Sequence, residues 1–346
     1  MHSAFDDMLG NERLRERLAN DIHAGRLSHA YIIEGADGLG KHTLALRIAA
    51  ALACEHRGSA DDTIPCRTCA ACRKILSGNS PDVIYINKGD KATMGVEVIR
   101  SMHADVYVAP NECEDKIYLI EDAHLMTVQA QNAFLLTLEE PPSYVRFFLL
   151  CNSTASLLET VRSRALTLRL EPIPTEVIGK HLCECDGEAR ALRDQSPREF
   201  RELLVCANGS VGKAKQLLDP KRRKPILERR DAAREFILLC TKRHNSMEAL
   251  RFFKPFWEKR GRDEIVAQLN ECLVCVRDLL LCKQTDRVPL CFFSEREEAA
   301  ELSYQFSAPE LLRVGTGLEN AINRVQANAN IRLTLTSLAV DVGLLS

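Results

Sequence analysis

A glycine-rich segment, Gly35-Ala-Asp-Gly-Leu-Gly-Lys-His-Thr43, places the strongest constraint on the fold. The apolar run before it, residues 30–34, predicts a strand, and the alanine- and leucine-rich run after it predicts a helix over residues 43–54. This order turns backbone N–H groups and a helix N-terminus toward one anion. The segment therefore predicts a phosphate-binding loop, with a glycine-rich turn that binds nothing as the alternative. The loop residues predicted to bind nucleotide are Gly35, Gly38, Gly40, Lys41, His42 and Thr43.

Further strands are predicted where short apolar runs alternate with helical patterns, at residues 82–86, 116–121, 146–151 and 166–170. Such alternation is typical of a parallel sheet with helices on both faces. From Thr175 onward the patterns are helical. We therefore predict an α/β region followed by all-α regions. The predicted limits are 1–170, 171–222 and 223–346, the last one set at the polar, proline-ended run 221–225.

Two departures from the usual nucleotide site stand out. The residue after the loop lysine is normally Ser or Thr, whose hydroxyl ligates Mg²⁺, whereas His42 offers an imidazole, a poor ligand for this ion. Thr43 lies about 100° further around the helix and should point elsewhere. The acidic pair at the end of the third strand is Glu121-Asp122, the reverse of the usual order, which changes side-chain reach by about 1 Å. We therefore expect weak nucleotide binding or poor metal placement. Two solvated acids at a strand end are the alternative.

Four of the fourteen cysteines are concentrated in one segment, at Cys54, Cys66, Cys69 and Cys72. Nothing in the sequence points to export, so reduced thiols or a metal are expected rather than disulfides. Their spacing suits four thiolates around a tetrahedral Zn²⁺ in a module over about residues 54–80, with buried free thiols as the alternative. By contrast, Cys272 and Cys275 lie on an apolar helical run and are expected to pack in a core.

Charge and hydropathy exclude several classes of protein. With 46 basic and 48 acidic residues, the chain has no global positive field, so contact with DNA would be local or made within a larger assembly. No run of about 18 uncharged apolar residues predicts a membrane span. Residues 1–13 carry acidic side chains and lack the apolar segment of a secretory signal. A cytoplasmic protein is expected.

A fourth feature is Ser163-Arg164, predicted to lie between a helix and the last strand. The planar guanidinium of an exposed Arg164 could reach a phosphate bound by a neighbouring subunit. Taken alone, such an arginine is usually only a surface charge.

The glycine-rich loop, the acidic strand end, the four-cysteine segment and Ser163-Arg164 together resemble the AAA+ subunits of the bacterial replicative clamp loader. Residues 135–142, Leu-Leu-Thr-Leu-Glu-Glu-Pro-Pro, are similar to a signature of that family, and Ser163-Arg164-Ala165 is similar to its Ser-Arg-Cys motif with alanine in place of cysteine. The resemblance covers about residues 5–215, and beyond it only the helical character agrees. It implies a P-loop domain with an inserted structural zinc module, a helical lid domain and a C-terminal helical collar used for oligomerisation.

Two subunit types compete within that family. The gamma/tau motor type has hydroxyl residues after the lysine, Asp-Glu on the acidic strand, and an arginine where this chain has Gly212. His42, Glu121-Asp122 and Gly212 therefore resemble the delta-prime type, a stator in a pentameric ring that loads the sliding clamp onto primed DNA. The implied partners are gamma/tau and delta, with the clamp and primed DNA reached through the complex.

In that type the subunit is a component of DNA polymerase III and a weak or inactive ATPase. Its Arg164, with Ser163, would act in trans on a neighbour's ATP site, while the retained Lys41 and glycines leave residual ATP or ADP binding open. A gamma/tau-like motor remains the alternative. A zinc-dependent nucleic-acid-binding module ranks last, because no aromatic residues are interleaved with the basic residues near the cysteines.

Overall fold

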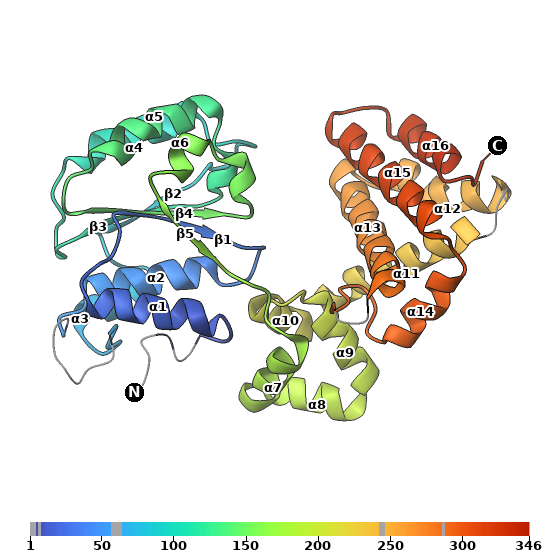
Figure 1. The fold of residues 1–346 in the computed structure, drawn as a ribbon, viewed down its shortest axis with the longest axis horizontal. Coiled ribbons are helices and arrows are strands. Elements are labelled where there is room, and N and C mark those ends of the chain that lie inside the picture. The colour runs from blue at the N-terminus through green and yellow to red at the C-terminus, as the bar shows by residue number, and fades with distance from the viewer. Residues whose placement is uncertain (1–4, 6–7, 57–63, 242–245, 286–287, 346) are drawn as a thin grey trace. The chain divides into compact units, whose positions relative to one another are not determined.

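A computed structural model describes residues 5, 8–56, 64–241, 246–285 and 288–345 (Figure 1). The chain divides into two compact units. One unit comprises residues 1–174 and 209–212, and the other comprises residues 175–208 and 213–346. The three domain limits expected from the sequence stay a prediction.

The first unit contains a five-stranded parallel sheet whose strand order is β2-β3-β4-β1-β5. The strands are β1 (Ala30–Glu34), β2 (Val83–Ile86), β3 (Lys116–Ile120), β4 (Val145–Cys151) and β5 (Leu166–Arg169). Every residue of β3 is buried, as expected for a central parallel strand covered on both faces. The order places β1 between β4 and β5, so the loop after β1 begins beside the end of β4. Crevices at the carboxyl ends of parallel strands are where such sheets bind ligands.

Helices cover both faces of this sheet (Figure 1). One face carries α1 (Glu12–His23), α2 (Lys41–Leu52) and α3 (Ala70–Leu76), and the other carries α4 (Val96–Val106), α5 (Val128–Glu139) and α6 (Glu159–Arg162). Single-turn 3₁₀ helices span η1 (Ala123–Leu125) and η2 (Thr154–Ser156). Alternate residues of β1 serve the two cores, because Tyr31 and Ile33 pack on the α2 side whereas Ile32 packs on the α5 side. The predicted α/β architecture is confirmed.

The described residues of the second unit form helices joined by loops and turns. Its helices are α7 (Thr175–Cys185), α8 (Gly187–Gln195), α9 (Pro197–Cys206), α10 (Val211–Leu218, whose first two residues belong to the first unit), α11 (Pro220–Thr241), α12 (Ser246–Lys259), α13 (Arg262–Gln284), α14 (Arg296–Tyr304), α15 (Ala308–Gln326) and α16 (Ile331–Asp341). Cys272 and Cys275 are buried in the core that α11 to α16 share, which confirms their predicted packing role. None of the described helices is both long and apolar enough to cross a membrane.

The expected helix break at residues 221–225 is wrong, because α11 runs through it from Pro220 to Thr241. Pro220 takes the first helical position, where proline is favoured, and Pro225 follows close to the start, where it removes a single backbone hydrogen bond. Buried Arg223 holds this first part in place. Its guanidinium donates to the carbonyl oxygens of Leu217 and Leu218 at 2.9 and 3.1 Å and to Glu199 at 2.7 Å.

Candidate functional site

The glycine loop and the acidic strand end line one cavity of about 370 Å³ at the carboxyl edge of the sheet. Its lining residues are Asp37, Gly38, Gly40, Lys41, His42, Thr43, Glu121, Asp122 and Leu150. Gly38 and Gly40 have φ angles of 80° and 92°, which residues with a Cβ rarely adopt. The structure thus brings together the two segments that the sequence analysis assigned to nucleotide binding. Gly35 contributes its carbonyl oxygen, which accepts a hydrogen bond from Lys41.

Lys41 is turned back onto the protein. Its ammonium group donates to the carbonyl oxygen of Gly35 and to Oδ1 of Asn152, both at 2.5 Å, and lies 3.4 Å from Oδ1 of Asp37. The side chain is only 13% exposed. An ammonium group has three N–H donors, so these acceptors can occupy all of them, and a phosphate would have to displace at least one.

Asn152 was missed by the sequence analysis. It follows directly after β4, whose last residue, Cys151, pairs with Glu34 at the end of β1. A polar residue directly after a buried strand was the available signal, because parallel strands end at one edge of the sheet. The signal could be used only once the strand order was known.

The side chain of His42 is about half exposed and lies against the acidic end of β3. Its Nε2 atom lies 3.8 Å from Oε1 of Glu121, and its ring stacks on Tyr85 with a centroid distance of 5.7 Å. Burial raises the pKa of Tyr85, and the negative charge of Glu121 raises it further. The imidazole therefore lies on the side of the cavity that the acidic strand end forms. Thr43, expected to point elsewhere, lines the cavity as well.

A later segment of the chain, residues 209–212, returns to the phosphate loop. The hydroxyl of buried Ser210 donates to the carbonyl oxygen of Gly38 at 2.6 Å. A Cβ atom added at Gly212 would lie 3.7 Å from the same carbonyl oxygen. The position at which the resemblance places an arginine is thus next to the loop, and here it has no side chain. Ser210 gave no signal in the sequence, because its role depends on this return of the chain.

Glu34, the last residue of β1, directly precedes the phosphate loop and joins neighbouring segments at this edge of the sheet. Its carboxylate accepts hydrogen bonds from the backbone N–H and hydroxyl of Thr154 at 3.0 and 3.2 Å, and from Arg169 at 2.9 Å. Burial alone would raise the pKa of Glu34, but these hydrogen bonds and the charge of Arg169 outweigh it and lower the pKa. The ionised carboxylate therefore ties the end of β1 to the segment after β4.

Arg164 lies at the surface, after α6, and is not among the described residues that line the cavity. Its Nη1 atom donates to the carbonyl oxygen of Thr160 at 3.0 Å, and its Nη2 atom lies 2.8 Å from Oε1 of Glu139. The side chain remains 39% exposed. Ser163 is exposed beside it and donates to the carbonyl oxygen of Thr160 at 3.1 Å. Both residues are therefore accessible to another molecule.

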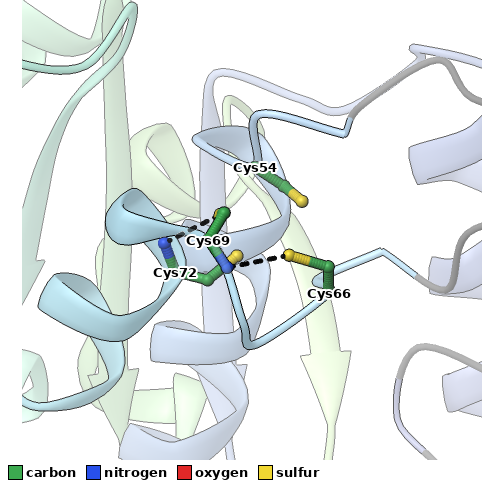
Figure 2. A group of neighbouring side chains, drawn as sticks. All are labelled: Cys54, Cys66, Cys69 and Cys72. Carbon is green, nitrogen blue, oxygen red and sulfur yellow. Dashed lines mark hydrogen bonds between the residues drawn. The ribbon is translucent and has the colours of Figure 1, made fainter.

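The four predicted cysteines converge at the far end of α2, and Figure 2 shows their side chains around one point. Their sulfur atoms all lie within 4.8 Å of one another. Tetrahedral zinc with Zn–S bonds of 2.3 Å needs sulfur atoms about 3.8 Å apart, so small rearrangements would accommodate the ion. The backbone N–H groups of Cys69 and Cys72 donate to the sulfur atoms of Cys66 and Cys69 at 3.3 and 3.4 Å (Figure 2). The donor set therefore fits a thiophilic metal.

The thiols of this cluster differ in acidity. Burial raises the pKa of Cys54 and of Cys72. Burial would also raise the pKa of Cys66, but hydrogen bonds from the Thr68 side chain, the Cys69 backbone and the His56 side chain outweigh it and lower the pKa to about 5. The hydrogen bonds at Cys66 thus favour its thiolate, and a bound cation would favour ionisation of the buried thiols of Cys54 and Cys72.

Comparison with known proteins identifies relatives of this chain. The family model described as "DNA polymerase III, delta subunit" matches residues 10–174. The gamma subunit of DNA polymerase III from Buchnera aphidicola is 32% identical over 62% of this chain and 58% of its own length. The tau subunit from Escherichia coli is 34% identical over 62% of this chain and 32% of its own length. The delta' subunit from Bacillus subtilis is 29% identical over 92% of each chain.

The chain therefore spans between about a third and three fifths of the length of the gamma and tau relatives that it matches. The segment that the family model matches, residues 10–174, includes the phosphate loop, the cysteine cluster and the five strands. The parallel sheet with its P-loop agrees with the AAA+ fold that the sequence implied. Together these matches support the assignment of the chain to the family of DNA polymerase III clamp-loader subunits.

Proposed function

We propose that this chain is a delta-prime-type subunit of the clamp loader, acting as a stator in a cytoplasmic pentameric ring with gamma/tau and delta. The ring would load the sliding clamp onto primed DNA. In this proposal the chain hydrolyses ATP poorly or not at all. Its contribution is Arg164, which would stabilise negative charge on the phosphates bound by the neighbouring subunit.

The observation that carries the proposal is the contact between His42 and Glu121. Their atoms lie 3.8 Å apart, so the imidazole stands where a hydroxyl would ligate Mg²⁺ and faces one of the acids that would support the ion. The ammonium group of Lys41 also already donates hydrogen bonds to Gly35 and Asn152. ATP hydrolysis depends on placing metal and lysine on the β- and γ-phosphates, and both are compromised here.

The extent of the similarity supports the same assignment. The delta' relative aligns over 92% of both chains, whereas the gamma and tau relatives align over 215 residues. Gly212 adds a third departure from the motor type, because no side chain extends from it toward the phosphate loop.

We also propose that Cys54, Cys66, Cys69 and Cys72 hold a structural Zn²⁺. A closed set of four thiolates leaves no open position for substrate or water, so the ion would supply folding energy rather than chemistry. The hydrogen bonds at Cys66 and Cys69 would orient the ligands.

The second candidate function is a gamma/tau-like motor. It is favoured by the retained loop geometry, because Gly38 and Gly40 keep the left-handed conformations and Lys41 lines the cavity. In this alternative, nucleotide binding would displace Lys41 from Asn152.

Two measurements test the proposal. The purified chain, with ATP and Mg²⁺, is expected to release no phosphate above a Lys41→Ala control. In a complex reconstituted with gamma/tau and delta, Arg164→Ala should abolish the ATPase contribution of the neighbouring site while the complex still assembles, because an arginine finger typically contributes ~10³–10⁵-fold at the site it serves. Steady Mg²⁺-dependent turnover by the isolated chain would instead establish the motor function.

A further inference from the structure

The guanidinium of Arg164 is held from two sides, and the partner on one side is Glu139, the last residue of α5. We propose that Glu139 is a positioning residue, which sets the orientation of Arg164 before a neighbour's phosphate arrives. The inference rests on the proposed function of Arg164 and goes beyond it, because it assigns a role to a side chain in a different helix.

The place of Glu139 in α5 supports this role. A carboxylate at a helix C-terminus faces the negative end of the helix dipole, which is unfavourable. The last turn of α5 carries no basic residue, and a second acid, Glu140, follows directly. The cation that offsets these charges comes from outside the helix, and it is Arg164, whose Nη2 atom lies 2.8 Å from Oε1 of Glu139.

The geometry restrains the arginine without burying it. Nη1 is fixed by the carbonyl oxygen of Thr160 at 3.0 Å, within the same helical turn, and Nη2 is fixed by Glu139 across the gap to α5. An arginine side chain has large rotamer freedom that must be lost when it binds an oxyanion. Two contacts made in advance remove part of that loss, while 39% of the side chain stays accessible.

Both partners are about half exposed, so the effect should be modest. Exposed ion pairs contribute little, and loss of the charge on Glu139 is expected to slow the reaction about two- to fivefold. Because Arg164 would act on the transition state rather than on ATP binding, the loss should fall on kcat and leave KM for ATP unchanged.

The test uses the complex reconstituted with gamma/tau and delta, and its ATPase stimulated by clamp and primed DNA. Four versions of this chain are compared: Glu139→Gln, Glu140→Gln, Arg164→Ala, and the double variant of Glu139 and Arg164. Glu140→Gln is the matched control, because it removes the same charge one residue away from the contact. The thermal midpoint of each isolated chain checks that folding is unchanged.

We expect Glu139→Gln to lower kcat about two- to fivefold, Glu140→Gln to leave it unchanged, and the double variant to match Arg164→Ala alone. Equal kcat for Glu139→Gln and the unmodified complex would overturn the inference. So would an equal loss in Glu140→Gln, or a further loss in the double variant, because either shows an action that bypasses Arg164. If Arg164→Ala leaves kcat unchanged, the proposed function and the inference both fail. If Arg164→Ala lowers kcat but Glu139→Gln does not, only the inference fails, so the two failures can be told apart.

Discussion

Helix α2 connects two sites that differ in completeness. At its N-terminus the phosphate loop has its backbone geometry, with glycines at positions 38 and 40 in the left-handed region, but it presents an imidazole where a metal-binding oxygen is expected. At its C-terminus, Cys54 joins three further cysteines in a closed set of one ligand type. The phosphate loop retains its backbone conformation but lacks a hydroxyl for Mg²⁺, whereas the cysteine cluster has all four donors that a tetrahedral metal needs.

The difference follows from how each site is assembled. The four cysteines lie within nineteen residues of sequence, so local folding brings them together. The phosphate site draws on the ends of three strands and on residues 209–212. A change at one contributor, such as His42, alters its chemistry without unfolding anything. Loss of one cysteine would remove a quarter of the ligands.

The largest expected effect is at the cysteine end. The unmodified chain should contain one zinc per molecule by elemental analysis, and Cys69→Ser should lose the metal and unfold the module, because the metal-binding free energy of such sites is on the order of 10 kcal/mol. Thermal unfolding with and without chelator measures the loss. Cys185→Ser, which changes an exposed thiol outside the cluster, should behave like the unmodified chain. If the purified chain contains no metal and chelator does not change its melting temperature, the four cysteines are buried free thiols and the zinc proposal is wrong.

At the phosphate end, Glu34→Gln should lower the free energy of unfolding by about 2 kcal/mol at pH 7, because hydrogen bonds to a charged acceptor are weakened. The pKa of Glu34 is lowered in the folded chain. Its contribution is therefore complete above the ordinary glutamate pKa of about 4.3 and is lost as the pH falls through the lowered value. Urea unfolding of both proteins across this range should show the difference shrinking in acid.

The matched control for that experiment is Glu171→Gln, an exposed acid near the same strand edge. It should change the free energy of unfolding by less than about 0.5 kcal/mol. An equal effect of the two substitutions would mean that net charge, and not the contacts of Glu34, is responsible.

The smallest expected effect concerns the side-chain hydroxyl that is absent at position 42. His42→Ser restores a hydroxyl beside Glu121 and should tighten ADP binding about tenfold in Mg²⁺ but not in chelator, as one added charge-assisted ligand would. Calorimetric titration of the isolated chain measures both affinities. His42→Ala is the control, since it also frees Glu121 but adds no oxygen. If alanine and serine give the same gain, the histidine blocks the cavity sterically and the metal argument is wrong.

Much of this arrangement could be predicted from the sequence, because it depends on local patterns. The five strands were expected within one residue of their observed bounds, and the glycine loop and the acidic strand end, both assigned to nucleotide binding, line one cavity. The grouping of the four cysteines was expected from their spacing, and the structure brings their sulfur atoms together.

The remainder depends on contacts between distant segments. The strand order placed Asn152 beside Lys41, and the return of the chain at residues 209–212 placed Ser210 on Gly38. The error at residues 221–225 has the same origin. Proline and polar residues favour a break there locally, but the buried contacts of Arg223 with α9 and α10 hold the segment as helix.

The backbone at position 212 has a consequence for descent. A Cβ atom there would meet nothing closer than 3.7 Å, and the residue does not require the left-handed conformation that favours glycine. The backbone at this position therefore accepts a Cβ atom without a clash. This one departure from the pattern of the motor type could arise or revert by a single substitution without altering the fold.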